Sequence, residues 1–216
     1  MHFRYPIFLN LAGKRCLVTG EGGELAGKVR ELLTSGAEVS YVNPRAEDVI
    51  ADLAKQGALR WHARAFAASD LDGCFLVLSA LQDNAALFRL AEQRKVLCNA
   101  ADDPGHSRFI FGSVHRQGDF TIAASTNGAA PALAVRIKQR FQQEIGPEYA
   151  VFVDMLKQVR GEIKQRIPDF AARRELWYRM VDSAALEKIR AGNAQGAREQ
   201  IRELIESAAK PNPAML

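Results

Sequence analysis

The sequence is poor in the residue types that bind metals or act as activated nucleophiles. Its 216 residues include three cysteines and four histidines, and these form neither a CxxC nor an HExxH motif. GxSxG and Walker A motifs are also missing. Because zinc sites and disulfide frameworks need clustered Cys and His residues, we expect no metal site and no secreted disulfide fold. Isolated cysteines suit a reducing compartment, so the cytoplasm is the expected location.

Long apolar runs and a strong excess of one charge are missing as well. No apolar run reaches the roughly 18 residues of a membrane span, and the first residues lack the cleavage site of a signal peptide. The 29 Lys and Arg residues exceed the 25 Asp and Glu residues, which gives a net charge of +4. Such mild basicity without a basic tail predicts neither a nucleic-acid partner nor a membrane partner.

The first half of the chain alternates short apolar runs with longer helix-like segments. This alternation is typical of an α/β fold, in which a Rossmann-like parallel sheet is covered by helices. The predicted parallel strands are residues 16–19, 39–42, 59–62, 75–79 and 96–99. Two further β-like segments, 108–111 and 120–124, predict antiparallel additions to the same sheet.

The last third of the chain is predicted to be entirely helical. The apolar spacing and the Gly and Pro residues between segments predict helices at 133–145, 149–167, 170–181, 186–191 and 195–208. Amphipathic helices need an apolar partner surface, which favours a homodimer. We therefore expect an NAD-binding Rossmann-like domain (1–113), a small α+β dimerisation segment (114–146) and a helical C-terminal domain (147–216). The tail 210–216 is expected to fray.

A glycine-rich turn directly follows the first predicted strand. Its backbone N–H groups can approach a pyrophosphate at the start of the next helix, as in the GxGxxG motif. The motif departs from its pattern at Leu25, and Asn43 replaces the acidic residue that ends the second strand in NAD-binding folds, so the choice between NAD and NADP stays open. A turn without nucleotide is the alternative. The predicted cofactor-binding residues are Gly20, Gly22, Gly23, Glu24, Leu25, Asn43, Pro44, Ser79 and Ala80.

The segment Asn99-Ala-Ala-Asp102-Asp103-Pro104 follows the last predicted parallel strand. Open α/β folds bind their ligands at this carboxyl edge of the sheet. A carboxylate placed there can accept a proton, if its pKa and its distance from the substrate suit that role. The alternative is that Asp102 or Asp103 merely caps the loop.

A second turn of small residues precedes the predicted helix that starts near Pro131. The residues Ser125, Thr126, Asn127 and Gly128 can present free backbone N–H groups to an anion. Basic residues before and after this turn make binding of a polycarboxylate plausible, although a solvated basic face is the alternative. These residues are Arg108, His115, Arg116, Arg136, Lys138 and Arg140.

Five segments, taken in their order and spacing, resemble the precorrin-2 dehydrogenase and sirohydrochlorin ferrochelatase family, the dehydrogenase part of siroheme synthase. The resemblance spans nearly the whole chain. The matching segments are Tyr5-Pro6-Ile7-Phe8-Leu9, the glycine-rich turn 17–28, Leu97-Cys98-Asn99-Ala100-Ala101-Asp102, Ser125-Thr126-Asn127-Gly128 and Arg173-Arg174-Glu175-Leu176-Trp177.

The resemblance implies a homodimer that oxidises precorrin-2 to sirohydrochlorin with NAD, and in some members then inserts ferrous iron as a second substrate. Asp102 matches the aspartate that the family needs for dehydrogenation. The residues expected to bind the tetrapyrrole are Asn99, Arg108, Ser125, Thr126, Asn127, Gly128 and Arg136.

Departures from the family pattern support a competing hypothesis. Ala130 stands where a serine is common, and Leu81 lies in a stretch where Ala-Thr-Asp-Asp is usual. These changes put iron insertion in question. They also leave open a non-catalytic module that binds a nucleotide or tetrapyrrole and regulates or delivers it to a partner enzyme.

Overall fold

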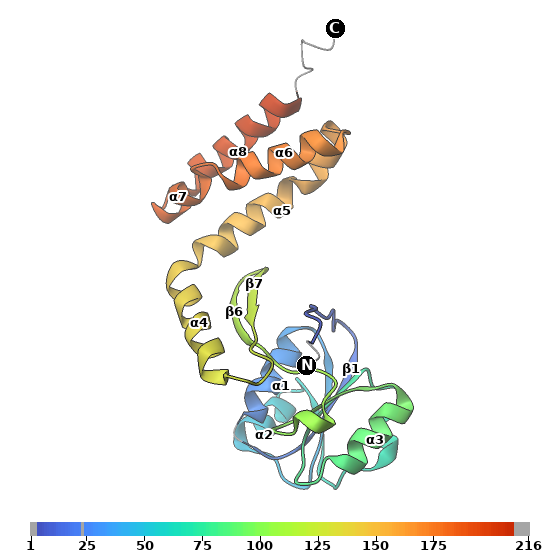
Figure 1. Cartoon of the computed structure of the whole chain (residues 1–216). Helices are drawn as coiled ribbons and strands as arrows, with labels where there is room; N and C mark the ends of the chain where they lie inside the picture. The colour runs from blue at the N-terminus through green and yellow to red at the C-terminus, as the bar shows by residue number, and fades with distance from the viewer. Residues whose placement is uncertain (1–3, 23, 210–216) are drawn as a thin grey trace. The chain divides into compact units, whose positions relative to one another are not determined.

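The computed structural model describes residues 4–22 and 24–209. The chain divides into two compact units, which we call unit 1 (residues 1–111) and unit 2 (residues 112–216). Figure 1 shows the chain of both units as a ribbon. Gly23 and the tail 210–216, on which two predictions fall, lie outside the described residues. The finer division of the chain at residues 113 and 146 stays a prediction.

Unit 1 contains a parallel sheet of five strands in the order β3-β2-β1-β4-β5. The strands are β1 (Arg15–Gly20), β2 (Glu38–Val42), β3 (Arg60–His62), β4 (Leu76–Ala80) and β5 (Leu97–Ala100). The helices are α1 (Leu25–Thr34), α2 (Asp48–Lys55) and α3 (Ala85–Arg94), with 3-10 turns η1 (Ala68–Leu71) and η2 (Pro104–His106). The strand order reverses between β1 and β4, which is where doubly wound sheets bind ligands. The predicted Rossmann-like fold is confirmed.

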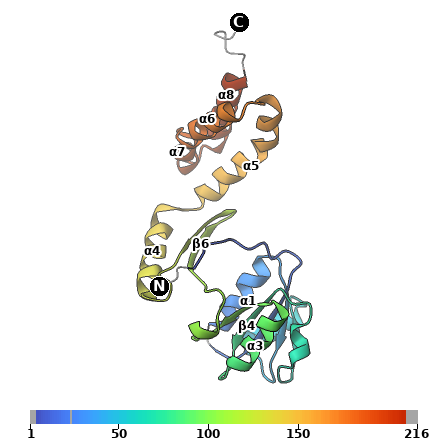
Figure 2. The ribbon, with the colours of Figure 1, turned by 45° about the vertical axis from the view of Figure 1, so that its right-hand side comes forward.

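Helices cover both faces of this sheet, as Figures 1 and 2 show, with α1 and α2 on one face and α3 on the other. Successive side chains of a strand point to opposite faces. Accordingly, Cys16 and Val18 of β1 lie in the core with Val29 of α1. Leu17, between them, packs in the second core with Leu87 of α3. Burial on both faces explains why these strands are continuous apolar runs in the sequence.

The predicted antiparallel additions to this sheet are wrong. The segment 108–111 is not a strand, although its backbone is joined to β5 by a hydrogen bond from Arg108 N to Cys98 O of 2.8 Å. Phe109 and Phe111 pack edge to face at 5.5 Å between ring centroids and lie against the unit 1 core. The apolar run that predicted a strand therefore reflects two rings packed against the core.

Unit 2 begins with a separate antiparallel sheet of two strands, β6 (Ser113–Gln117) and β7 (Phe120–Ala124). Gln117 pairs with Phe120 across the tight turn. The second strand agrees with the prediction for 120–124, but its partner is residues 113–117 rather than 108–111.

The rest of unit 2 is helical, as predicted. The helices are α4 (Pro131–Glu144), α5 (Glu148–Arg166), α6 (Phe170–Val181), α7 (Ala185–Arg190) and α8 (Ala194–Ala209). Helices α5 to α8 share an apolar core that includes Phe152, Ile163 and Ile201, and Trp177 of α6 packs against it. Asp169 caps α6, because its Oδ2 accepts a hydrogen bond of 2.6 Å from Ala172 N. Among the described residues, none of the helices has the length and apolarity needed to cross a membrane.

Candidate active site

The glycine-rich turn lies at the switch point of the sheet, where β1 and β4 end side by side. Gly20 pairs with Ala80 of β4 and has a φ of +96°. A Cβ atom on Gly20 would lie 2.3 Å from the carbonyl carbon and oxygen of Ala80. Only glycine fits here, because a side chain would clash with backbone and strain the left-handed conformation. Because Gly20 lies so close to the Ala80 carbonyl, the chain passes directly from β1 into the turn that precedes α1.

The N-terminus of α1 is open to an anion. Glu24 at the N-cap makes no side-chain cap, and the first turn contains no acidic residue. A Cβ atom on Gly22 would meet nothing within 4 Å. Leu25, the departure from the GxGxxG pattern, is buried in the unit 1 core and leaves this space free. Free N–H groups and the helix dipole therefore fit the diphosphate of a dinucleotide at this turn.

Asn43 organises the end of β2. Its side chain is buried, and its Nδ2 donates to Glu21 Oε1 at 2.9 Å and to Arg45 O at 2.8 Å. The carbonyl oxygen of Asn43 accepts a hydrogen bond of 3.0 Å from Trp61 Nε1. Pro44, which follows, is exposed. Asn43 thus joins the turn after β1 to the loop after β2.

Tyr41 supports the glycine-rich turn through a hydrogen bond, a role that the sequence did not predict. Its hydroxyl lies 2.7 Å from Gly20 O and is fully buried. The pKa of Tyr41 is raised to about 12, mainly by burial and in smaller part by the charges of Glu21 and Glu47. The phenol therefore stays neutral and donates a hydrogen bond to the turn. A tyrosine inside an apolar strand was the available signal, since a buried hydroxyl needs a partner.

The end of β4 holds a small buried polar pair. Ser79 Oγ donates to Asn84 Oδ1 at 2.6 Å, and both residues are buried. Asn84 was not among the predicted site residues. Its amide also bonds the carboxylate of Asp103 and helps to lower the pKa of that group. The pair therefore links the end of β4, where cofactor contacts are predicted at Ser79 and Ala80, to the loop after β5.

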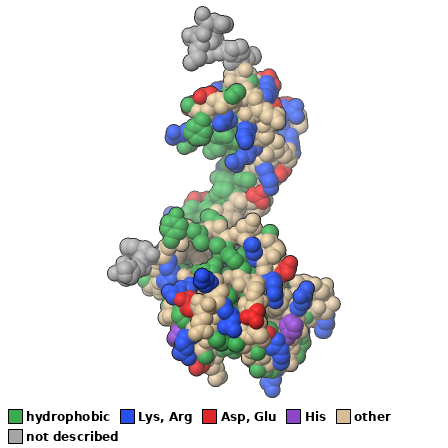
Figure 3. All heavy atoms as spheres, turned by 90° about the vertical axis from the view of Figure 1, so that its right-hand side faces the viewer, with side chains coloured by type: hydrophobic (Ala, Val, Ile, Leu, Met, Phe, Trp, Pro, Cys, Tyr) green, Lys and Arg blue, Asp and Glu red, His purple; other side chains and the backbone are tan. Residues whose placement is uncertain are grey.

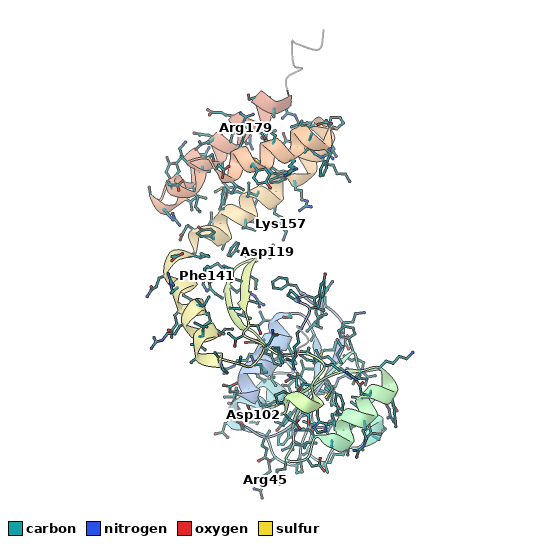
Figure 4. The ribbon with its side chains drawn as sticks, in the orientation of Figure 1. Arg45, Asp102, Asp119, Phe141, Lys157 and Arg179 are labelled. Carbon is teal, nitrogen blue, oxygen red and sulfur yellow. The ribbon has the colours of Figure 1, made fainter. Side chains whose placement is uncertain are left out.

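Asp102 lies in that loop, in a left-handed conformation with a φ of +55°. A bond of 2.7 Å from Ala101 N to Ser79 O holds the turn to β4, and Ala100 N donates to Ser107 Oγ at 2.9 Å. The carboxylate is exposed at the carboxyl edge of the sheet (Figure 4). A positive φ at a non-glycine residue is uncommon and gathers at functional sites.

Asp103 and Asp102 have different surroundings. Asp103 Oδ2 lies 2.7 Å from His106 Nδ1, and this contact is the largest cause of the lowered pKa of Asp103. Among the described residues, the Asp102 side chain makes no hydrogen bond. Of the two carboxylates, Asp103 stabilises the loop and Asp102 faces solvent. Asp103 stands at the N-cap position of η2, but its carboxylate bonds the His106 ring and makes no side-chain cap.

Two predicted tetrapyrrole ligands of unit 1 have intramolecular partners. Asn99 Nδ2 donates to Phe109 O at 2.8 Å, which holds the docked segment 108–111. Arg108 forms an ion pair with Glu92 and lowers the pKa of that carboxyl. Both residues position the loop after β5, and the structure leaves their binding role a prediction.

The predicted anion turn of unit 2 brings four residues together before α4. Ser125 Oγ accepts a bond of 3.1 Å from Asn127 N, and Thr126 Oγ1 accepts one of 3.0 Å from Ala130 N. Asn127 and Gly128 have φ values of +54° and +86°. Both hydroxyls therefore shape the turn itself.

The predicted basic patch is only partly formed. Arg136 on α4 is exposed and its guanidinium touches Gln139 at 3.2 Å. His115 is buried, and its Nε2 lies 2.8 Å from Ile145 O, so its inclusion in a solvent-facing patch was wrong. Among the described residues, no group of three or more His, Cys, Asp or Glu side chains is arranged to hold a metal ion.

Comparisons with known proteins assign a class to each part of the chain. Residues 7–113 match the family described as "Putative NAD(P)-binding", and residues 148–205 match the "Sirohaem synthase dimerisation region". The fold and the glycine-rich turn thus define a Rossmann-type NAD(P)-binding domain joined to a dimerisation region.

The individual relatives that the chain matches are named siroheme synthase. The chain is 32% identical over 208 residues to siroheme synthase 1 of Serratia proteamaculans and covers 44% of it. It is 32% identical over 209 residues to siroheme synthase of Nitrosococcus oceani and covers 45% of it. Each alignment spans 95% of this chain, which is less than half the length of these relatives. The chain is thus similar to siroheme synthases, as its resemblance predicted.

A solved structure shares the fold. The structure titled "SirC, precorrin-2 dehydrogenase" superposes with a TM-score of 0.74 over 92% of this chain and 99% of that chain. The two sequences are 23% identical. The order of a parallel-sheet domain followed by a helical region is therefore common to both.

Proposed function

We propose that this protein oxidises precorrin-2 to sirohydrochlorin, with NAD+ as the cofactor and Asp102 as the proton acceptor. When bound, NAD+ supplies the hydride acceptor. The substrate ring loses one hydride and one proton, and the exposed carboxylate of Asp102 takes the proton. Relatives named siroheme synthase and precorrin-2 dehydrogenase support this assignment of substrate.

The proposal depends on one juxtaposition above all. Gly20 ends β1 beside Ala80 of β4, and Ala101 N bonds Ser79 O of the same strand. The nucleotide turn and the Asp102 turn therefore flank one strand at one edge of the sheet, about two strand spacings or roughly 10 Å apart. With the dinucleotide bound at its turn, this separation leaves room for a substrate ring between the reactive end of the dinucleotide and the Asp102 carboxylate, which would act as the base.

The substrate carries several carboxylates, so cationic and N–H groups would hold it. We propose this role for Arg136 and for the turn formed by Ser125, Thr126, Asn127 and Gly128. Arg136 is exposed, and a Cβ atom on Gly128 would meet nothing within 4 Å, so the turn is accessible. Guanidinium groups and free backbone N–H groups are common carboxylate ligands.

We further propose that the protein is a cytoplasmic homodimer that associates through unit 2. The match to a dimerisation region supports this assembly. Large apolar side chains are exposed on α6, where Phe170 is 72% and Tyr178 is 56% accessible, and Figure 3 shows apolar surface on unit 2. Such a surface is stable in water when a partner covers it. The free thiols Cys16, Cys74 and Cys98 support a reducing location.

An anaerobic absorbance time course with enzymatically made precorrin-2 and NAD+ tests the activity. We expect the sirohydrochlorin spectrum to grow with matching NADH. Asp102→Ala should lower kcat by at least about 100-fold, the usual contribution of a general base, while NAD+ binding is retained. Asp72→Asn is the matched control, because Asp72 pairs with Arg94 before the amino end of β4. Full activity of Asp102→Ala would refute the assigned role.

The same assay separates two further outcomes. Ferrous iron added after the first phase tests chelation, which requires a rate above that of the protein-free control. Binding of both NAD+ and precorrin-2 without any conversion would refute the dehydrogenase and favour the non-catalytic binding module.

A further inference from the structure

The glycine-rich turn carries an acidic side chain that phosphate binding does not require. Glu21 lies between Gly20 and Gly22 and is exposed. Its Oε1 accepts a hydrogen bond of 2.9 Å from Nδ2 of Asn43. Asn43 follows β2 at the position where NAD-binding folds carry an acidic residue for the ribose hydroxyls. A carboxylate is therefore present at this position, but it comes from the turn after β1.

The hydrogen bonds of Asn43 fix that carboxylate in place. The amide has two N–H donors, and they reach Glu21 Oε1 and Arg45 O. Because Asn43 is 6% exposed, its amide has little freedom to turn away. A neutral amide also leaves the charge of Glu21 uncompensated, which a lysine or arginine would not. An aspartate at position 43 would instead place two carboxylates together, which is unfavourable for both.

We propose that Glu21 selects NAD+ over NADP+ and takes the role of the missing acid at the end of β2. Among the described residues, its second oxygen, Oε2, makes no hydrogen bond. That oxygen is an acceptor for ribose hydroxyls, and its charge repels a 2′-phosphate. The inference rests on the proposed function, because a nucleotide must occupy the adjacent turn.

Arg45 is the feature that could favour NADP+ instead, since an arginine near this position accommodates a 2′-phosphate in related folds. Its side chain is exposed and extends from the outer surface of unit 1 (Figure 4). Within the described parts of the chain it forms no ion pair. Its backbone oxygen, rather than its guanidinium, is held by Asn43. The fixed group at the end of β2 is thus the carboxylate.

Isothermal titration of the full chain with NAD+ and with NADP+ tests the proposal without any turnover. We expect wild type to bind NAD+ at least about tenfold more tightly, and Glu21→Gln to reduce that ratio by roughly tenfold, as loss of one charged hydrogen bond implies. Glutamine keeps the size of the side chain and an oxygen for Asn43. Glu38→Gln is the control, because Glu38 is exposed at the opposite end of β2 and should leave the ratio unchanged.

Asn43→Ala provides a second variant. It keeps the Glu21 charge but removes its tether, so the NAD+ to NADP+ ratio should fall less than in Glu21→Gln. Circular dichroism at the titration temperature identifies loss of fold, which would remove binding of both nucleotides together. An unchanged ratio in a folded Asn43→Ala protein would overturn the tethering role.

The outcomes separate this inference from the proposed function. An unchanged ratio in Glu21→Gln, with precorrin-2 oxidation intact, overturns the role of Glu21 alone. Wild type that prefers NADP+ overturns it as well and points to Arg45. Binding of neither nucleotide by wild type overturns both this inference and the proposed NAD+-dependent reaction.

Discussion

The two units use polar groups in different ways. In unit 1, burial raises the pKa of Cys16 to about 11 and that of Tyr41 to about 12, and both groups stay neutral inside the sheet. In unit 2, the shifted groups lie at the surface, where ion pairs such as Lys157 with Asp119 and Arg190 with Glu148 favour the charged forms. The buried Tyr41 hydroxyl of unit 1 therefore supports the glycine-rich turn, whereas these ion pairs of unit 2 connect α5 to α7 and to the turn between β6 and β7.

The two units also differ in how their apolar side chains are covered. Unit 1 covers both faces of its sheet with its own helices. Unit 2 builds one core between α5 and α8 and leaves Phe170, Tyr178 and Val181 exposed on α6. A hollow of about 540 Å³ lies beside these side chains, lined also by Trp177. The exposed apolar side chains on α6 support the assignment of association to unit 2.

The largest effect on stability and NAD+ binding is expected at Gly20, where a side chain on β1 would clash with the backbone of β4. Gly20→Ala would place a Cβ atom 2.3 Å from the Ala80 carbonyl at a φ of +96°. We expect a loss of about 3 kcal/mol in the free energy of unfolding, and loss of NAD+ binding. Urea unfolding and calorimetric titration measure the two effects.

The control is Gly27→Ala in α1, where a Cβ atom meets nothing within 4 Å. It should stabilise the helix by about 0.5–1 kcal/mol. Equal stability of the Gly20 and Gly27 variants would show that the approach to Ala80 does not constrain the turn.

The association assigned to unit 2 predicts the next largest effect. Val181→Glu puts a charge on the exposed apolar face of α6, where Val181 is 52% accessible. If a second copy covers this face, burial of the charge should raise the dimer Kd by about 100-fold. Light scattering across a concentration series measures it. Arg179→Glu alters charge at a neighbouring exposed site of the same helix (Figure 4) and should leave the dimer intact. Identical dimers in both variants would place the interface elsewhere.

Alkaline pH should affect unit 1 through Tyr41. Its pKa is about 12 in the folded state against an ordinary value of 10.0, so the unfolded chain loses the phenol proton first. Stability is therefore unaffected by this group below pH 10 and falls between pH 10 and 12, by up to about 1.4 kcal/mol per pH unit.

Tyr41→Phe isolates that contribution. It should cost about 1 kcal/mol at neutral pH, because Gly20 O loses its partner, and the difference from wild type should then shrink above pH 10. Urea unfolding at several pH values gives both curves. Parallel curves up to pH 12 would mean that the phenol does not titrate with unfolding.

The sequence predicted the elements better than the contacts between them. The run 75–79 became β4 (Leu76–Ala80), because a strand buried on both faces must be apolar along its length. The same reasoning failed at 108–111, where Phe109 and Phe111 are partly buried because they pack against the core. Local apolarity identifies what is buried, and distant contacts decide whether a ladder forms.

The candidate site shows the same difference between residues that the sequence predicted and residues that it missed. Position relative to a strand end was enough to single out Gly20 and Asp102. Tyr41, Asn84 and Glu21 were missed because their roles depend on partners brought together by folding. The Tyr41 hydroxyl, for example, meets Gly20 O 21 residues away. Basic charge at Arg108 was visible, but its partner Glu92, 16 residues earlier, was not.

The smallest effect is expected at the surface ion pair between Lys157 of α5 and Asp119 in the turn between β6 and β7 (Figure 4). The Nζ and Oδ2 atoms are 2.7 Å apart, but the side chains are 67% and 64% accessible. Solvent screens such a pair, and holding two long side chains costs entropy. Lys157→Ala should therefore leave the Tm unchanged at 0.15 M salt, as measured by calorimetry. A clear drop in Tm that high salt abolishes would show that the stability of unit 2 depends on surface charge. The two units would then differ in their surface electrostatics as well as in burial.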